Sequence, residues 1–397
     1  MATHAKPTEL VKFNVSPMVK GLSHLFVVVG VAAFAFGLTK DPQRAWTSYL
    51  TAFFFFASLG IGGLFFTAIQ HVTNAHWSVT VRRYAEAMTA FLPIAAILGI
   101  IFVLFGAEHL YQWLNPDLVA SDVLLQKKVA YLNKNFFTIR MVVFFALWLW
   151  FAKVIVSRSL NQDQSGDEKL TLKNVGSSVR FLLVFAITYS LFGVDLLMSL
   201  DPHWYSTMFG VYCFAGLFQS TLAALILITL WIKKSGKIDG VVNENHLHDL
   251  GKFLFAFTIF YAYIGFSQFM LIWYANIPEE TLYFVHRSHG VWFAISMSLL
   301  ALKFLVPFLA LMTRGSKRNP KVLVPVALLI LVMQYVDNYW LVYPNFNEGH
   351  AAFSLTEVGV FLGFLGLFVV ALSYFLGRFS VVPVKDPRLE ESLHHHI

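Results

Sequence analysis

The chain has 397 residues, of which 57% are hydrophobic and only 13% are charged, and its formal net charge is +7. An ordinary soluble domain carries roughly 25% charged residues, so the composition excludes a soluble globular protein and indicates one that crosses a membrane several times. The single cysteine, Cys213, excludes a disulfide, a CxxC zinc site and an iron–sulfur cluster held by this chain alone. The basic residues lie between apolar runs, so the positive charge indicates membrane orientation and not a nucleic-acid partner.

Ten apolar segments are long enough to cross a bilayer, and they predict an all-α polytopic membrane protein with about ten transmembrane helices. The segments are 21–39, 46–70, 84–105, 136–157, 178–198, 206–232, 250–274, 287–312, 321–343 and 353–377. The first is longer than the apolar core of a signal peptide, so we expect it to be retained as a helix. No second domain is expected: the chain 1–397 is a single membrane domain with polar ends at 1–20 and 378–397.

The distribution of lysine and arginine predicts the orientation. Segments on the same side as the N-terminus carry 21 of the 29 basic residues, whereas the opposite connections carry 6. Cationic connections face the cytoplasm, so both termini are predicted to be cytoplasmic and the opposite connections to face outward.

Three further expectations concern the polar segments between and after the apolar runs. The outer segment 106–135 contains Tyr111, Trp113 and Leu114, which suit a helix lying on the membrane surface. The inner loop 159–177 is polar and is expected to be mobile. The tail 378–397 is expected to be exposed, and its final histidines are either native or the remnant of a tag.

Ionisable residues within apolar helices are costly in a bilayer, so each one is a candidate functional residue. Asp195, Asp337 and Glu357 lie near the expected outer ends of their helices, and so does Arg140. Lys303 is expected to lie deeper, nearer the cytoplasmic side. The outer half of the membrane therefore collects both carboxylates and cations.

The segment 250–274 adds a polar stripe to this set. Tyr261 and Gln268 recur at helical spacing on one face with Thr258, and Tyr263 lies on a second face. A stripe of this kind can hold a chain of waters and side chains that passes protons. The candidates for proton transfer are Asp195, Asp337, Glu357, Lys303, Arg140, Tyr261, Tyr263 and Gln268.

Structural alternatives exist for these residues. Arg140 and Glu357 lie within one turn of a helix end and can extend toward water. Asp195 can cap the polar turn that follows it, and the hydroxyl groups can bond helices together. Asp337 and Lys303 can each belong to a purely structural ion pair.

Two outer connections, Ser199–Gly210 and Leu271–Arg287, combine tryptophan and tyrosine with a turn that joins proline to an acid. Proline fixes such a turn, and the aromatic residues anchor it at the level of the lipid head groups. A rigid, charged, outward-facing rim suits a quinol-site border or the docking of an extramembrane partner, although an ordinary interfacial turn has the same composition. The rim candidates are Asp201, His203, Trp204, Glu279, Glu280, His286, Arg287 and His289. No apolar segment carries a histidine near its middle, so we expect no haem or metal ligand in this chain.

Three stretches resemble a known family. They are DLLMSLDPHWYSTMFGVY (Asp195–Tyr212), HLHDLGKFLFAFTIFYAYIGFSQFMLIWYANIPEET (His246–Thr281) and KDPRLEESLHH near the end. They are similar to the large integral membrane subunits of alternative complex III, a bacterial quinol:cytochrome c oxidoreductase. Those subunits belong to the NrfD/polysulfide-reductase group, and the length here is closer to the shorter, ActF-like kind.

The resemblance implies an architecture and a set of partners. Helices 2–5 and helices 6–9 would form two four-helix bundles, with helices 1 and 10 peripheral, in the bacterial inner membrane. The partners would be a homologous larger NrfD-like subunit, an iron–sulfur subunit and c-type cytochrome subunits, together with lipids. Haem c and iron–sulfur clusters would lie on those partners, and quinol or menaquinol is the small molecule implied. The motif match transfers Asp195, Asp201, His203, Tyr261, Tyr263, Gln268, Glu279 and Glu280.

The predicted function is therefore a membrane subunit that contributes to quinol binding or proton translocation and anchors the redox subunits, without being catalytic alone. A quinol head group bound by this chain would be sought between helices 2–5, near Asp195. The alternatives are a non-catalytic scaffold of the same complex, and a secondary transporter, for which matched broken helices would be expected.

Overall fold

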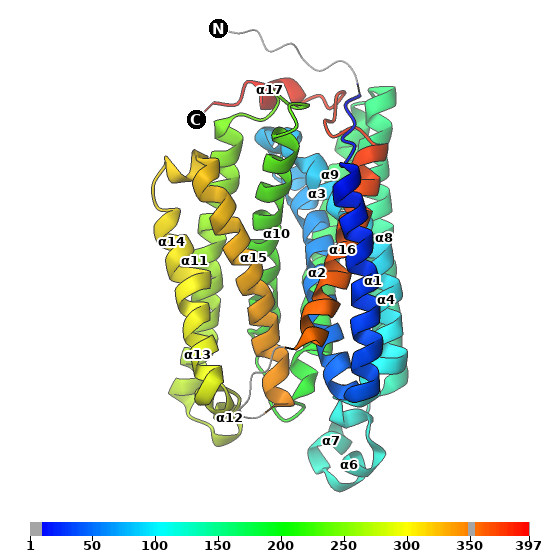
Figure 1. The fold of residues 1–397 in the computed structure, drawn as a ribbon, viewed down its shortest axis with the longest axis vertical. Helices are drawn as coiled ribbons and strands as arrows, with labels where there is room; N and C mark the ends of the chain where they lie inside the picture. The colour runs from blue at the N-terminus through cyan, green and yellow to red at the C-terminus, as the bar shows by residue number, and fades with distance from the viewer. Residues whose placement is uncertain (1–9, 348–353, 397) are drawn as a thin grey trace.

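The computed structural model describes residues 10–347 and 354–396, and within these ranges ten helices are long and apolar enough to cross a bilayer (Figure 1). The number predicted from the sequence is thus confirmed. Seven are single α-helices of nearly full span: α1 (Pro17–Lys40), α2 (Pro42–Val72), α8 (Lys134–Ser165), α10 (Phe209–Lys233), α11 (Glu244–Ala275), α15 (Pro320–Val342) and α16 (Leu355–Arg378). The fifth span is also nearly all α-helix: α9 (Lys169–Leu196) continues into a short 3₁₀ turn.

The other two spans are segmented. The third runs through α3 (Val79–Met88), α4 (Leu92–Ile101) and α5 (Ala107–Leu110), with a π-helical stretch at Phe102–Gly106. The eighth runs through α13 (Gly290–Ser298), a π-helical stretch at Leu299–Leu305, and α14 (Val306–Ala310). The short helices outside the spans are α6 (Pro116–Ser121), α7 (Val123–Lys128), α12 (Pro278–His286) and α17 (Leu389–Leu393).

The two ends of the molecule differ in what they carry. Both chain ends lie on the same side (Figure 1), and we call this side the tail end; the described chain there begins at Leu10 and finishes at His396. The opposite side, which carries α6, α7, α12 and the connection 197–208, is called the rim end.

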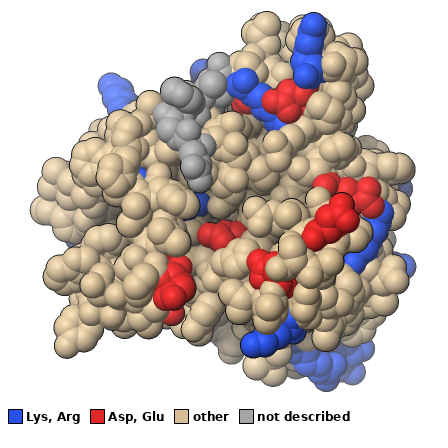
Figure 2. All heavy atoms as spheres, turned by 90° about the horizontal axis from the view of Figure 1, so that it is seen from below, with Lys and Arg blue, Asp and Glu red and all other residues tan. Residues whose placement is uncertain are grey.

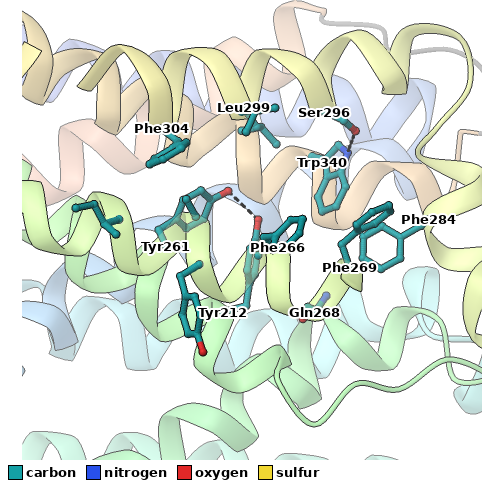
Figure 3. Close-up of a pocket in the computed structure, with 15 residues that line it drawn as sticks. Tyr212, Tyr261, Phe266, Gln268, Phe269, Phe284, Ser296, Leu299, Phe304 and Trp340 are labelled. Atoms are coloured by element: carbon teal, nitrogen blue, oxygen red, sulfur yellow. Dashed lines mark hydrogen bonds between the residues drawn. The ribbon is translucent and has the colours of Figure 1, made fainter. Parts of the chain in front are cut away.

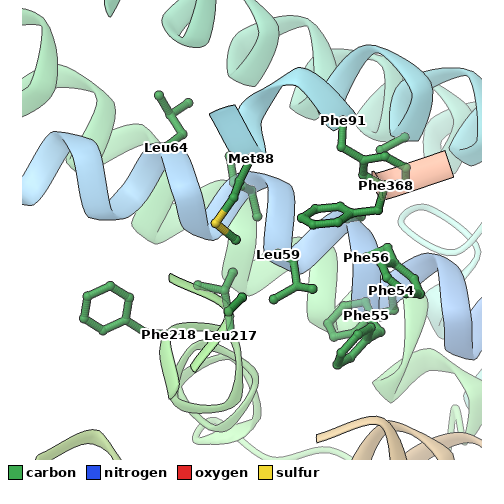
Figure 4. Close-up of a cluster of buried hydrophobic side chains, with 14 of the residues drawn as sticks. Phe54, Phe55, Phe56, Leu59, Leu64, Met88, Phe91, Leu217, Phe218 and Phe368 are labelled. Carbon is green, nitrogen blue, oxygen red and sulfur yellow. The ribbon is translucent and has the colours of Figure 1, made fainter. Parts of the chain in front are cut away.

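Helix α2 lies at the centre of the packing. It contacts α3, α4 and α9 on one side and α10, α15 and α16 on the other. Nearly all of its residues are buried, including the run Phe53–Phe56, because the helix is apolar around its whole circumference. The rings of this run pack on neighbouring helices (Figure 4): Phe54 stacks on Phe192 with centroids 5.5 Å apart, and Phe56 stacks on Phe364 at 6.2 Å.

The remaining helices complete two neighbourhoods on either side of α2. Helix α8 packs on α4 and α9. Helix α10 packs on α11 and α15, and the eighth span contacts both α11 and α15. Helices α1 and α16 lie along each other at the outside of α2 (Figure 1).

The contact of α1 with α16 depends on glycine. A methyl group added at Gly363 would lie 2.8 Å from the Cα atom of Gly30, so only glycine allows this backbone separation. The spacing of Gly359 and Gly363 on α16 is the small-residue pattern that brings membrane helices close together.

Several expectations about the connections are wrong. Tyr111 and Trp113 are buried and do not lie on the membrane surface: the Tyr111 hydroxyl donates to the carbonyl of Leu196 at 2.9 Å, and the Trp113 indole donates to the carbonyl of Ser199 at 3.1 Å. The inner loop 159–177 is mostly helix, because α8 extends to Ser165 and α9 begins at Lys169.

The C-terminal tail is docked on the tail end and is not exposed as its polarity indicated. Its apolar side chains Val381, Val382 and Leu389 are fully buried. Asp386 forms a buried ion pair with Arg82, which lies in α3 and not in a connecting loop. Several tail residues are apolar and buried, and others are paired with the bundle. The mean polarity of the tail therefore did not predict its exposure.

Replacing Gly363 by valine tests the packing of α1 on α16. The added side chain would force two backbones apart, and we expect the free energy of unfolding to fall by about 1–3 kcal/mol. Thermal unfolding of the detergent-purified protein measures this loss. Gly21→Val is the matched control, because a Cβ at Gly21 has no neighbour within 4 Å; equal melting temperatures for the two variants would contradict the packing.

Replacing Asp386 by alanine tests the docking of the tail. Arg82 would keep only Glu86, at 3.8 Å, and a buried cation that loses its partner costs about 3–5 kcal/mol. Limited proteolysis is expected to cut the tail of this variant faster. Glu390→Ala, on the exposed side of the tail, should behave as the unchanged protein; identical cleavage rates for the two variants would show that the ion pair does not hold the tail.

Candidate functional site

A buried ion pair joins the eighth span to α15. The Lys303 ammonium nitrogen lies 2.6 Å from Oδ2 of Asp337, and the two side chains are 0% and 1% exposed. The Tyr212 hydroxyl donates to Oδ1 of Asp337 at 2.5 Å and lies 2.8 Å from the hydroxyl of Tyr261. The Lys303 ammonium group also lies over the Tyr261 ring, 3.5 Å from its centroid. These four residues form one connected polar group, called here the Lys–Asp–Tyr network.

The local backbone explains how Lys303 reaches this position. It lies in the π-helical stretch Leu299–Leu305, and π-helical turns are often found at functional sites. Pro307 lacks an amide hydrogen, so the carbonyl of Lys303 loses its helical donor. The Gln219 side chain donates to that carbonyl at 3.4 Å, and it also donates to the Thr258 hydroxyl at 3.1 Å.

A cleft of about 550 Å³ lies beside the network, between α11 and the eighth span (Figure 3). Its walls are mainly apolar, and Tyr212 and Tyr261 form part of the lining. Tyr263 and Phe266 also line it and are each 63% exposed, so the cleft opens sideways at the apolar surface of the bundle. We call it the α11 cleft.

The α11 cleft also contains a polar side chain without a partner. Gln268 is only 4% exposed, and its Oε1 atom has no hydrogen-bond partner among the described residues. Ser296 and Trp340, also in the lining, bond to each other at 2.8 Å (Figure 3). The cleft thus offers one unsatisfied acceptor beside otherwise apolar walls.

A second buried ion pair lies between α8 and α9. Arg140 donates to both carboxylate oxygens of Asp195, at 2.7 and 3.1 Å, and the Tyr131 hydroxyl donates to the same carboxylate at 3.0 Å. Arg140 also lies over the Tyr131 ring, 3.8 Å from its centroid. Arg140 is therefore paired inside the protein and does not extend toward water, and the Asp195 carboxylate caps no turn.

Glu357 occupies a third paired position. Its carboxylate accepts from Arg44 Nε at 2.6 Å, from the Tyr343 hydroxyl at 3.3 Å and from the Ser354 amide at 2.7 Å. The contact with Ser354 is half of a capping box at the start of α16. This geometry gives Glu357 a structural task, because it joins α16 to α2.

The two outer connections meet at the rim end. Trp204 stacks on Tyr283 of α12 with centroids 3.8 Å apart, and it is buried, so it does not act as the head-group anchor expected for it. The Arg287 guanidinium group lies over the Tyr283 ring, 3.5 Å from its centroid. It donates to the carbonyls of Trp340 and Leu341 at the end of α15. Burial lowers the pKa of Arg287, and Tyr283 and Asp201 act in the opposite direction.

The other rim candidates lie at the surface. Glu279, His286 and His289 are exposed, and Asp201 and Glu280 are half-buried. His203 is exposed and lies 2.5 Å from Asp122, which ties the 197–208 connection to the helices α6 and α7. Seen from this end, acidic side chains form separate patches in a mostly uncharged surface, and basic side chains lie beside several of them (Figure 2).

The structure brings together only part of the predicted set. Tyr261, Lys303 and Asp337 are in one network, although Lys303 was expected at a different depth; its long side chain reaches Asp337 across the helix interface. Tyr263 lies on the outward face of α11, where it is mostly exposed and lines the α11 cleft. Gln268 lies in the adjoining cleft.

Sequence reasoning missed several partners. Tyr212 and Tyr131 were not chosen, because tyrosine near a membrane boundary usually indicates an interfacial anchor. A cluster at the tail end was also missed: Arg82, Arg83, Glu86, Asp163 and Asp386. The spacing of Arg82 and Arg83 with Glu86, one helical turn on, was the available signal for a helical ion pair.

The described residues contain no group of three or more His, Cys, Asp or Glu side chains placed to hold a metal ion. No known protein-family model matches the chain, and no curated protein matches its sequence.

A double replacement tests the Arg140–Asp195 pair. Arg140→Leu alone should lower the free energy of unfolding by about 3–5 kcal/mol, because it leaves a buried carboxylate unpaired. Adding Asp195→Leu should recover most of that loss, since two apolar side chains need no partners. Denaturant unfolding of the purified protein measures both values. If the double variant is as unstable as the single one, the two groups are not coupled.

Proposed function

We propose that this chain is a membrane subunit of a quinol:acceptor oxidoreductase complex, in which it binds quinol and accepts the protons that quinol oxidation releases. The observation that carries the proposal is the Lys–Asp–Tyr network, which joins a buried carboxylate to the wall of a sideways-opening apolar cleft. The sequence resemblance described above supports the same class of complex.

The α11 cleft has the properties that a quinol needs. Its opening at the apolar surface allows a lipid-soluble molecule to enter from the membrane, and its apolar walls suit a ring and an isoprenoid chain. The Oε1 atom of Gln268 can accept a hydrogen bond from a ring hydroxyl. Without such a donor, this buried amide oxygen lacks a partner.

The network supplies a proton acceptor beside that ring. Oxidation of a quinol gives a quinone, two electrons and two protons. The electrons would pass to the redox centres of the partner subunits. A single carboxylate holds one proton, so Asp337 would accept the first proton and release it to water before it accepts the second. The Tyr212 and Tyr261 hydroxyls connect the cleft to Asp337, and the Lys303 ammonium group stabilises the ionised carboxylate that must receive a proton.

The α11 cleft is not the quinol site that the sequence predicted between helices 2–5, near Asp195. Both oxygens of that carboxylate are bonded, to Arg140 and Tyr131, just as both oxygens of Asp337 are bonded, so the neighbouring cavities decide between the two sites. The nearby cavity, lined by Tyr131 and Asp201, has about 250 Å³, less than half of the α11 cleft. The α11 cleft is therefore the better quinol site.

The remaining parts of the proposal concern the assembly. Helices 2–5 and 6–9 would be two four-helix bundles, with α1 and α16 peripheral, in a bacterial inner membrane and with the tail end in the cytoplasm. The rim end would face the iron–sulfur and c-type cytochrome subunits, and Glu279, His286 and His289 are exposed there to meet them. A homologous larger membrane subunit would lie alongside.

Asp337→Asn in the intact complex tests the function. We expect quinol oxidation to slow by at least about 100-fold, the usual contribution of a positioned acid or base. Gln268→Leu should mainly raise the KM for quinol, because it removes a binding contact and not the proton acceptor. Steady-state turnover with a soluble electron acceptor, with proton release followed by a pH dye, measures both effects.

Two controls accompany this test. Glu280→Gln changes a rim carboxylate and should leave the KM for quinol unchanged. The yield of assembled complex shows that each variant folds. Unchanged turnover and proton release in an assembled Asp337→Asn complex would contradict the proposal and leave the chain as a scaffold.

A further inference from the structure

A group of cationic side chains lies at the tail end, where α11 begins and where the 311–319 connection leads into α15. Gly251 of α11 packs so closely on Lys317 that an added Cβ would lie 2.9 Å from the Lys317 Cβ. Arg318 donates to the Asn245 side chain at 2.6 Å, so the connection is held against the first turn of α11. Lys252 follows two turns after Asn245 on α11. Lys252, Lys317 and Arg318 are called here the basic pocket.

The positive charge of the basic pocket exceeds its negative charge. Asp249 lies 2.5 Å from Lys252, and it also lies 2.6 Å from a ring nitrogen of His395. Glu244, the other acid in this part of α11, is exposed in the first turn. Burial lowers the pKa of Lys317, and so does the nearby charge of Lys252. The three cations of the basic pocket thus outnumber the two carboxylates, Asp249 and Glu244.

Two buried nitrogen atoms in the same place lack hydrogen-bond partners among the described residues. Arg318 Nε is buried and has no hydrogen-bond partner among the described residues. His248 is only 6% exposed, its Nδ1 is likewise unpartnered, and Lys252 and Arg318 lie within electrostatic range of it. A buried polar atom without a partner usually indicates a group that is missing from the site. Arg318 Nε is a donor, so an acceptor would satisfy it, and the neighbouring cations favour an acceptor with negative charge.

The backbone adds to this preference for an anion. Helices α11 and α15 both begin at the tail end, so the positive ends of their dipoles point toward the same side of the molecule. The adjoining surface is apolar: Leu309 and Met312, at the end of the eighth span, are mostly exposed. An anion bound here would therefore lie at the border between a polar layer and the lipid chains.

We propose that the basic pocket binds the phosphate of an anionic phospholipid, with Lys252 and Arg318 on the phosphate and the acyl chains along Leu309 and Met312. Basic pockets between helices at a membrane surface bind acidic lipid head groups in this way. The shared chemistry is that of a phosphate anion, and the exposed apolar side chains beside the cations favour the lipid over free phosphate as its source. This site is separate from the α11 cleft and does not depend on the function proposed for it.

Native mass spectrometry of the full chain in detergent tests the proposal, with phosphatidylglycerol and phosphatidylcholine offered separately. We expect phosphatidylglycerol to be retained and phosphatidylcholine to be lost. The double variant Lys252→Gln/Arg318→Gln should weaken retention about five-fold for each lost cation. The matched control is Lys169→Gln/Lys173→Gln, which removes two exposed lysines at the tail end of α9 and should bind as the unchanged protein.

Four results would overturn the proposal. Equal loss of lipid in both double variants would indicate attraction by overall charge and no defined site. Retention of phosphatidylcholine as strong as that of phosphatidylglycerol would exclude recognition of a lipid anion. Displacement of phosphatidylglycerol by millimolar inorganic phosphate would make free phosphate the ligand. The charge-conserving variant Lys252→Arg/Arg318→Lys should retain the lipid, and its loss there, with an unchanged melting temperature, would also contradict the assignment.

Discussion

The need to pair every buried charge is the constraint on which the rest of this structure depends. A charge inside an apolar helix bundle is stable only with a partner and further hydrogen bonds. The contact of Lys303 with Asp337 shows the consequence most clearly, since it fixes the eighth span against α15 and draws two tyrosine hydroxyls onto the same carboxylate. The pairs of Arg140 with Asp195 and of Glu357 with Arg44 join other helices by the same rule. Charge therefore determines which faces of these apolar helices meet.

The three pairs differ in what surrounds them, and this difference separates a structural role from a chemical one. Glu357 caps its own helix, and both oxygens of Asp195 are bonded within the protein. Asp337 is bonded as fully, but its tyrosine partners reach a cleft that a lipid-soluble molecule can enter. In the function proposed above, this access to the cleft, and not burial alone, favours Asp337 over Asp195 and Glu357 as the proton acceptor.

The sequence was sufficient for the number of spans, since apolar length alone determines it. It also selected Lys303 and Asp337 as candidates, because ionisable residues are rare in such segments, and the structure places the two in contact. It could not show that these two residues touch, because their depths were judged from backbone position and a lysine side chain is long. The tail and the segment with Tyr111 and Trp113 were wrongly expected at the surface, since mean polarity does not reveal which individual side chains find partners.

The central claim is that the Asp337 carboxyl changes its protonation when quinol is oxidised. Redox-induced infrared difference spectroscopy of the assembled complex tests it most directly. The account predicts a protonated-carboxyl band that appears on quinol oxidation, is absent in Asp337→Asn and persists in Asp195→Asn. A band that survives in Asp337→Asn, or that disappears only in Asp195→Asn, would contradict the account.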